Sequence, residues 1–529
     1  MKRLAIALLS GLLPLALNAQ DVSPDTAARF AKALQKLGSE DFQEREAGSA
    51  ELVALPLEAL RLIEAELKKG EAELEVRSRL ERAVPEFKLK AKRSALKTKA
   101  EAEAAWTRKT TIDSYTQIGR KDPKWDAKAV EALTLTIRVW GKTATPGQDR
   151  QAYELASAAV AAGCDDPLVL YARARMYDVA IRKNFAEAIQ LHADAAKAMK
   201  ETGARYHELR QCFCFARAAE VISRKKELSD DDKKQAQDWL DLALSRLGEA
   251  AGDPTAPDVA LKEVGEMMIG TGMKLTRDRK IGFDKVFDVL TKARPESTMP
   301  LVLKGAVYIT YAWDARGGGW ANTVTEDGWK KMAERLDEAE KALTEAWKKN
   351  PDDPAAPTLM LGVELGQGKG RAVMETWYKR AMTADPDHFE ACGKKMYYLE
   401  PKWHGSPQDM LNFGRELLAG GNWEARLPFK LVDAHLTLAG YAEDKQKKAD
   451  YYKDEAVWKD VKAVYEGYLK RHPESNWDRT YYAKLACWCG HWNEAQVQFE
   501  KLGDKAMVGA FADRAEMDRL KAEAAEKGK

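Results

Sequence analysis

The chain has 529 residues, of which 45% are hydrophobic and 32% charged, a balance typical of a soluble and mostly helical protein. Its 85 Lys and Arg residues against 83 Asp and Glu residues leave a formal net charge of +2, which argues against a general electrostatic attraction to nucleic acid or to anionic membranes. The length allows either several domains or one extended array of repeats.

Residues 1–19 have the features of a secretory signal peptide. Lys2 and Arg3 supply the positive start, an apolar stretch follows up to Leu17, and Leu17-Asn-Ala19 fits a cleavage site. Cleavage would remove both cations, leaving 85 − 2 = 83 basic against 83 acidic residues. No later stretch reaches the ~20 apolar residues of a membrane span, so we expect no transmembrane segment after cleavage. The sequence therefore predicts export, to the periplasm, the cell envelope or the medium.

Residues 20–86 are predicted to form a small helical unit. Apolar residues recur every three or four positions, as at Phe30, Leu34 and Leu37. The segment from Leu37 to Leu52, which reads LGSEDFQEREAGSAEL, resembles a HEAT-type repeat common in exported proteins of planctomycete-like bacteria. The resemblance implies a HEAT-like helical unit, although Pro56 stands where that family usually has glycine.

Residues 87–127 begin with a basic run, FKLKAKR up to Arg93 and KTK up to Lys99. A nucleic-acid surface would need such charges on one face with aromatic residues between them. Only Trp106 lies near, and Glu101 and Glu103 follow at once. The pattern favours a solvated helical linker.

Helix pairs follow from residue 128 onward. For residues 128–290 the periodicity and the Gly and Pro breaks predict degenerate helical-hairpin repeats. The expected helices cover residues 129–140, 153–160, 167–181, 185–199, 206–223 and 231–247.

Residues 291–515 show a fixed period. Asn350-Pro351 and Asp385-Pro386 lie 385 − 350 = 35 positions apart, each after a helix rich in Ala and aromatic residues. A period of about 34 residues with a terminal proline is that of tetratricopeptide repeats. The predicted fold is therefore all-α: a helical-hairpin solenoid, or tetratricopeptide-like array, with a small N-terminal HEAT-like unit. Residues 516–529 are predicted to be a charged tail that frays.

Two motifs carry a second resemblance. W-x-A-R-G begins at Trp313, a Gly-Trp pair ends at Trp329, and P-K-W-x-G-S runs from Pro401 to Ser406. The stretch of about residues 285–440 resembles a bacterial exported tetratricopeptide-repeat family of unknown function. This resemblance implies a fold and no activity. Within the second motif, Ser406 and Pro407 predict the capped start of a helix that ends at Gly420.

The Trp/Gly-rich segment Trp313–Trp329 is the best candidate for a functional site. Its three consecutive glycines permit close backbone approach, Arg316 offers a rigid donor fork, and the tryptophans offer a shelf for a sugar ring, a peptide or a cation. Alternatively, the tryptophans pack an irregular insertion and Arg316 caps carbonyl groups. The candidate contact residues are Trp313, Asp314, Arg316, Trp320, Trp329 and Trp403.

No pattern points to catalysis. The chain lacks nucleophile motifs, and its 7 histidines show no zinc-ligand spacing. The six cysteines are too sparse for a disulfide scaffold, and we expect them to be small buried apolar residues. The glycine-rich turn from Gly366 to Arg371 matches no phosphate-binding motif and fits a turn between helices. We therefore expect no catalytic residue, cofactor or metal ion.

The sequence favours a non-catalytic protein-interaction scaffold of the periplasm or cell envelope, with a protein or peptide partner on the concave face of the array and no nucleic acid. The alternative is a small-ligand or glycan-binding module, with or without hydrolytic activity, with a pocket around the Trp313–Trp329 loop. Geometry separates the two. A scaffold requires an open groove, whereas a hydrolytic site requires a closed pocket with converging carboxylates.

Overall fold

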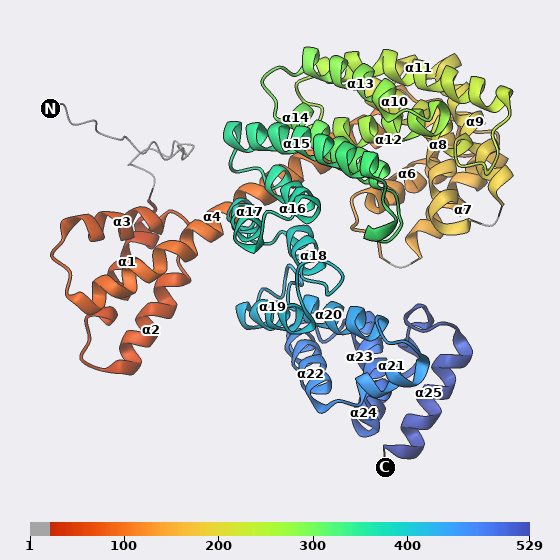
Figure 1. The fold of residues 1–529 in the computed structure, drawn as a ribbon. Coiled ribbons are helices and arrows are strands. Elements are labelled where there is room, and N and C mark those ends of the chain that lie inside the picture. Colours follow the sequence, from red (N-terminus) through yellow and green to blue (C-terminus); the bar gives the residue numbers. More distant parts are fainter. Residues whose placement is uncertain (1–21, 146, 183, 529) are drawn as a thin grey trace. The chain divides into compact units, whose positions relative to one another are not determined.

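The computed structural model describes residues 22–145, 147–182 and 184–528, which are predominantly helical and contain no β-strand (Figure 1). The predicted all-α helical-hairpin solenoid is confirmed. The predicted signal peptide lies outside the described residues. Within the described part, no helix is both long and apolar enough to cross a membrane. The chain divides into two compact units, Met1–Glu101 and Ala102–Lys529.

The first unit contains α1 (Pro24–Leu37), α2 (Phe42–Val53), α3 (Ala59–Lys69) and most of α4 (Leu74–Arg108). The hydroxyl of Ser23 caps α1 by accepting from the Thr26 N–H. The predicted apolar periodicity is confirmed, because Phe30, Leu37, Leu52 and Ile63 are all buried in one core.

Arg79 ties α2 to α4 inside this unit. Its guanidinium, almost fully buried, pairs with Glu46 at 2.9 Å and with Glu75 at 2.7 Å, and donates to the Ser49 hydroxyl at 2.8 Å. A buried arginine is tolerated because its donors are satisfied by carboxylates.

The region predicted as a linker, residues 87–127, is helical over most of its length, but it is not solvated throughout, because several positions between Trp106 and Tyr115 are buried. It comprises the end of α4, the π-helix η1 (Lys109–Asp113) and α5 (Ser114–Ile118). Trp106, Ile112 and Tyr115 are buried in the core of the second unit. These apolar residues follow the basic run in the sequence, and they anchor the segment by their burial.

Residues 128–290 lie in successive pairs of packed helices. They form the hairpins α6–α7, α8–α9, α10–α11 and α12–α13. A second π-helix, η2 (Tyr177–Ile181), continues α8. The bounds are α6 (Asp126–Trp140), α7 (Gln148–Ala161), α8 (Pro167–Met176), α9 (Phe185–Thr202), α10 (Glu208–Ile222), α11 (Asp230–Gly252), α12 (Asp258–Thr276) and α13 (Arg279–Ala293).

The next helices continue the array. Asn350-Pro351 and Asp385-Pro386 lie in the turns after α15 and α17, where the 35-residue spacing predicted helix ends. Helices α14, α16, α18 and α20 contact one another in succession, and we call them the first-helix row. The bounds are α14 (Met299–Arg316), α15 (Glu326–Lys349), α16 (Ala355–Gln367), α17 (Arg371–Ala384), α18 (Phe389–Tyr398), α19 (Pro407–Gly420) and α20 (Phe429–Gly440).

The C-terminal helices are α21 (Lys445–Tyr452), α22 (Glu455–Leu469), α23 (Asn476–Cys489), α24 (Trp492–Leu502) and α25 (Arg514–Lys527). Most of the region predicted as a fraying charged tail lies in α25. That helix buries Met517, Leu520 and Ala524 against the preceding hairpin, so it is a packed element rather than a frayed one. Its charged residues cover the opposite face.

Two further local predictions concern caps and cysteines. Ser406 caps α19 by accepting from the Asp409 N–H at 3.2 Å, as the S-P-x-D pattern predicts. Gly420 is still helical, and Gly421, at φ +61°, takes the left-handed position that ends α19. All six cysteines lie among the described residues and are buried, as expected, and none is in a disulfide there.

Gly414 is needed for the close contact between α19 and α20. A Cβ there would lie 2.8 Å from the Leu431 Cα, and backbone cannot give way as a side chain can. We expect Gly414→Ala to lower the free energy of unfolding by about 1–2 kcal/mol. Gly420→Ala in the same helix is the control, because nothing lies within 4 Å of its Cβ position. Urea unfolding of both variants measures the difference; equal stabilities would contradict the packing argument.

Candidate functional site

The Trp313–Trp329 segment joins α14 to α15. Helix α14 ends at Arg316, and Gly317 takes a positive φ of +77°; Gly318 and Gly319 do not. The short 3-10 helix η4 (Ala321–Thr323) follows, and the Thr325 hydroxyl caps α15 by accepting from the Gly328 N–H at 3.0 Å. Only one of the three glycines is therefore required by backbone conformation.

Arg316 holds this loop together. Its guanidinium donates to the carbonyl oxygens of Gly317 at 3.1 Å and of Gly319 at 2.9 Å. It also lies between the rings of Trp313 and Trp329, 5.5 and 5.3 Å from their centroids. This is the carbonyl-capping arrangement that the packing interpretation predicts for Arg316.

The remaining candidates of the loop diverge. Asp314 does not pair with Arg316; its carboxylate accepts from the Arg279 Nε of α13 at 2.9 Å. Trp320 is 81% exposed and Trp329 40% exposed. Trp329 is therefore linked to Trp313 through Arg316, whereas Trp320 has no ring contact with either among the described residues.

Trp403 meets Trp313 from a turn ninety positions further along the chain. The rings pack edge to face with centroids 5.6 Å apart, and Tyr397 packs on Trp403 at 5.7 Å. The turn is fixed because Gly405 leaves no room for a Cβ beside the Leu399 carbonyl, and because a ring nitrogen of His404 contacts the Leu365 carbonyl oxygen at 2.9 Å.

These aromatic residues border a hollow of about 890 Å³, which we call the α14–α18 groove. Four of the six candidates line it, namely Trp313, Asp314, Arg316 and Trp403, whereas Trp320 and Trp329 do not. Its other lining residues include Ile309, Leu361, Gly362, Leu365, Phe389, Glu390, Gly393, Lys394, Tyr397 and Lys430. Most come from three successive helices of the first-helix row.

Sequence reasoning missed the groove residues of α16 and α18. Leu361 and Leu365 on α16, and Phe389, Gly393 and Tyr397 on α18, stand four positions apart and so share one face of each helix. That spacing was available as a signal. It is also the spacing of ordinary core residues, so it did not mark a surface.

Two glycines keep the floor of the groove low. A Cβ at Gly362 would lie 3.8 Å from Ile309, and one at Gly393 3.7 Å from the Lys430 ammonium. Both distances are ordinary van der Waals contacts, so packing between helices does not require glycine at either position. Because glycine has no side chain, Gly362 and Gly393 leave the space of the groove next to them unfilled.

The fixed charges of the groove are largely neutralised within the protein. Besides the Asp314–Arg279 pair, Glu390 lies 3.6 Å from Lys394, and Lys430 pairs with Asp433 at 2.8 Å. No two carboxylates of the lining are placed as an acid and base couple free of cations. The lining therefore favours apolar contact over hydrolysis or phosphate binding.

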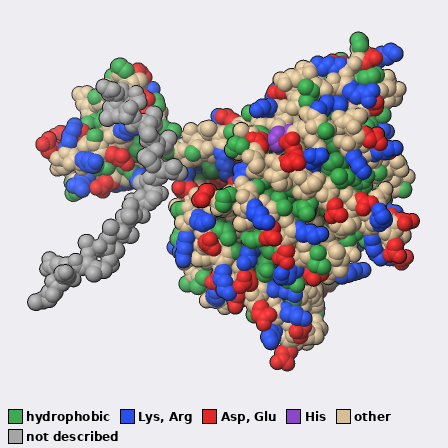
Figure 2. Space-filling model, turned by 90° about the horizontal axis from the view of Figure 1, so that it is seen from above, with side chains coloured by type: hydrophobic (Ala, Val, Ile, Leu, Met, Phe, Trp, Pro, Cys, Tyr) green, Lys and Arg blue, Asp and Glu red, His purple; other side chains and the backbone are tan. Residues whose placement is uncertain are grey.

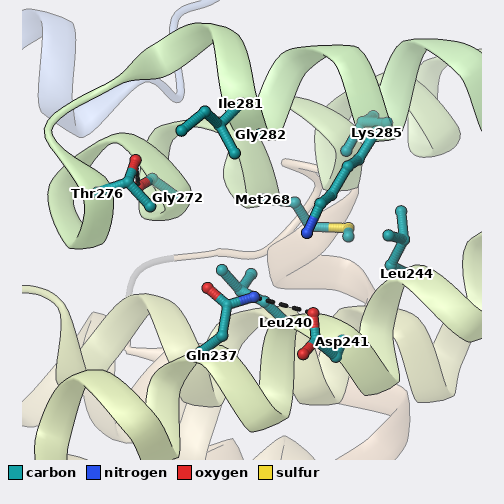
Figure 3. A pocket seen from close by; sticks show the side chains of 11 residues that line it. Gln237, Leu240, Asp241, Leu244, Met268, Gly272, Thr276, Ile281, Gly282 and Lys285 are labelled. Carbon is teal, nitrogen blue, oxygen red and sulfur yellow. Dashed lines mark hydrogen bonds between the residues drawn. The ribbon is translucent and has the colours of Figure 1, made fainter.

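A second, much smaller cavity lies between α11, α12 and α13 (Figure 3). It measures about 40 Å³ and is lined by apolar side chains such as Leu240 and Met268. Gln237 donates to Asp241 at 2.9 Å along its α11 side (Figure 3). A space of this size holds at most a few water molecules and no organic ligand.

Two further features of the described residues bear on metal and phosphate binding. Within the described residues, no group of three or more His, Cys, Asp or Glu side chains is placed to hold a metal ion. The cations of the glycine-rich turn are both paired, Lys369 with Glu340 and Arg371 with Asp409, each at 2.5 Å. That turn therefore connects helices, as expected.

Glu364 is a buried acid without a partner on α16. It is 1% exposed, and both its carboxyl oxygens lack a hydrogen-bond donor in the described structure. Burial raises its pKa, and the nearby Lys369 offsets this only in part. Glu364 is not among the residues that line the groove, whereas Leu361 and Leu365 of the same helix are.

Comparisons with known proteins do not assign the chain to a family. No family model matches it, and no curated protein matches it. Among solved structures, a human IFIT1 dimer with m7Gppp-AAAA covers 92% of this chain and 95% of its own at 12% identity and a TM-score of 0.30. The TPR domain of P58(IPK) covers 75% and 98% at 13% identity and a TM-score of 0.17. Naa15/Naa10 bound to HypK-THB covers 83% and 73% at 13% identity and a TM-score of 0.18. Likenesses this weak carry no argument about ligand or partner.

Proposed function

We propose that this protein is a non-catalytic interaction scaffold that binds an extended protein segment in the α14–α18 groove. The observation that carries the proposal is the groove itself, which runs along successive stacked helices and is lined mainly by apolar and aromatic side chains above a glycine floor. Tandem hairpins bind extended peptides in this way because each repeat adds similar contacts along the row.

The charge pattern supports a protein segment of low charge rather than a polyanion. Phosphate recognition needs free cations, whereas Lys394 and Lys430 are paired with carboxylates. The third cation of the lining, Arg316, is engaged by two backbone carbonyls and two tryptophan rings. On the face shown in Figure 2, basic and acidic side chains are interspersed over the surface. An apolar segment would instead gain from burying Phe389, Tyr397 and Leu365.

A glycan is the second candidate, supported by one observation. Trp313, Tyr397 and Trp403 form a contiguous aromatic cluster at the groove, and aromatic faces stack on sugar rings. Hydrolysis of that glycan is not part of the proposal, because Asp314 and Glu390 are each paired with a cation.

The scaffold is further proposed to act outside the cytoplasm, in the periplasm or cell envelope, as a member of the bacterial exported tetratricopeptide-repeat family that its motifs resemble. The support is the signal-like segment 1–19 together with the motifs at Trp313 and Pro401.

Binding of displayed peptides tests the proposal. Peptides are selected from a random library on the full chain, and fluorescence anisotropy measures their affinity. Tyr397→Ala removes an exposed ring of the groove and is expected to weaken binding by about 2 kcal/mol, roughly 30-fold. Phe42→Ala, in the first unit and 62% exposed, is the matched control and should leave affinity unchanged.

Two results would reject a peptide groove. Selected peptides that bind the Tyr397→Ala variant as tightly as the wild type would place their site elsewhere. A glycan array in which oligosaccharides bind in a Tyr397-dependent way, while no peptide is enriched, would establish the second candidate instead.

A further inference from the structure

Arg210 is a buried arginine in α10, held between two tryptophans. It is 6% exposed, and its Nε donates to the Thr110 hydroxyl of η1 at 3.0 Å. Its guanidinium carbon lies 4.9 Å from the Trp106 ring centroid and 5.4 Å from that of Trp140. The α4–η1 segment, α6 and α10 thus enclose one cation.

No carboxylate neutralises this charge. Among the described residues, none forms an ion pair with Arg210; the exposed Glu263 of α12 acts on it only at longer range. Burial lowers the pKa of Arg210 to about 10, which still leaves the guanidinium charged at neutral pH. An unpaired charge in the interior costs several kcal/mol unless another group compensates it.

The neighbouring arginines show what is missing. Arg175 and Arg217 both act electrostatically on Tyr171, as Arg210 does, so the three belong to one cluster. Arg175 lies 3.7 Å from Asp178, and Arg217 pairs with Glu220 at 2.9 Å. Arg210, the most buried of the three, is the one without a carboxylate.

Unpartnered polar atoms accompany Arg210. One terminal nitrogen of its guanidinium and the Trp140 Nε1 are buried and have no hydrogen-bond acceptor in the described structure. The hydroxyls of Thr111, beside Thr110, and of Thr136, one turn before Trp140 on α6, are also without partners. Thr110 and Thr111 lie in a π-helix, a distortion found frequently at functional sites.

We propose that Arg210 and Trp140 form a binding site for a small oxyanion, a carboxylate or a phosphate group. Carboxylate and phosphate oxygens accept hydrogen bonds from both kinds of donor that lack an acceptor here, the terminal guanidinium nitrogen of Arg210 and the indole N–H of Trp140. Its negative charge supplies the counter-ion that Arg210 lacks. The site shares no residue with the α14–α18 groove, so it is independent of the proposed scaffold function.

Thermal unfolding of the full chain tests the site. Sodium acetate and sodium phosphate are titrated separately at constant ionic strength, with sodium chloride making up the balance. The wild type is expected to show a saturable rise in Tm with acetate, with phosphate or with both, since a ligand that binds only the folded state stabilises it. The arm that responds identifies the oxyanion.

Three variants locate the effect. Arg210→Met should abolish the dependence on the oxyanion. Trp140→Phe keeps a ring but removes the N–H, and should raise the half-saturating concentration several-fold. Arg246→Met on α11, which removes a partly exposed pair with Glu249, should respond as the wild type does.

The proposal is overturned if the wild-type Tm does not rise above that in chloride alone, or if Arg210→Met keeps the rise. Should Arg210→Met fail to fold, Trp140→Phe decides. A half-saturating concentration unchanged from the wild type then overturns the site, and a several-fold increase supports it.

Discussion

Replacing Glu364 by methionine is expected to raise the free energy of unfolding by about 1–3 kcal/mol at pH 7.5, the usual cost of a buried polar group without partners. Glu364 is 1% exposed, and neither carboxyl oxygen accepts a hydrogen bond in the described structure. Methionine has a similar length and no polar group to desolvate. Removal of the acid therefore stabilises α16 instead of leaving a cavity.

The stabilisation should depend on pH in a defined direction. Burial raises the pKa of Glu364 in the folded state, whereas in the unfolded chain the group ionises near its ordinary value of about 4.3. Below that value the acid is neutral in both the folded and the unfolded state, and it destabilises the folded state least. As pH rises toward the folded pKa, the unfolded state gains more from ionisation, and stability falls. Above the folded pKa the penalty is constant.

Urea unfolding at pH 4, 6 and 7.5 measures this effect. The difference between Glu364→Met and the wild type should grow across that range. Glu345→Met on α15, which replaces an exposed acid, is the control and should show no comparable growth. A Glu364→Met variant that is less stable than the wild type at every pH would mean that the carboxyl has a stabilising partner.

Filling the floor of the α14–α18 groove is expected to abolish peptide binding without harming the fold. Gly362→Leu places an isobutyl group above a Cβ position that is only 3.8 Å from Ile309 and not in conflict with it. We expect peptide affinity to fall by about tenfold or more. Stability should hold or rise by about 0.5–1 kcal/mol, because glycine inside a helix is unfavourable.

Gly270→Leu in α12 is the matched control. It makes the same exchange inside a helix, at a position with no atom within 4 Å of the Cβ and outside the groove. It should gain similar stability and bind peptide as the wild type does. If Gly362→Leu binds with wild-type affinity, the peptide does not occupy the floor of the groove. If both variants lose affinity, the loss does not come from the groove.

Much of the fold could be predicted from local patterns. The helices of residues 128–290, the turns at Asn350 and Asp385, and the cap at Ser406 all follow from periodicity, proline and capping residues. These signals depend on residues only a few positions apart, so they can be recognised in a single sequence. The burial of Trp106 and Tyr115 was not predicted, because the neighbouring basic run made the whole segment read as solvent-exposed.

The candidate site was predicted only in part. The residues that were recognised belong to one local motif, and those that were missed lie on other helices, far away along the chain. Trp313 and Arg316 were recognised from their motif, but Trp320 in the same motif is exposed and lies outside the groove. Sequence marks a residue as unusual without showing which residues of other helices will face it. Tyr397, for example, is 40% exposed and lines the groove, although its spacing on α18 is that of an ordinary core residue.

The sequence by itself determined that this chain is an all-α array of helix pairs, because helical periodicity, turn residues and caps are encoded within a few positions. Only the tertiary structure decided which faces remain uncovered and which charges remain unpaired. Trp403 contacts Trp313 although four α-helices, α15 to α18, lie between them in the chain, and Arg210 meets Thr110 from 100 positions away. Such contacts depend on how successive hairpins stack, and no local pattern records that geometry.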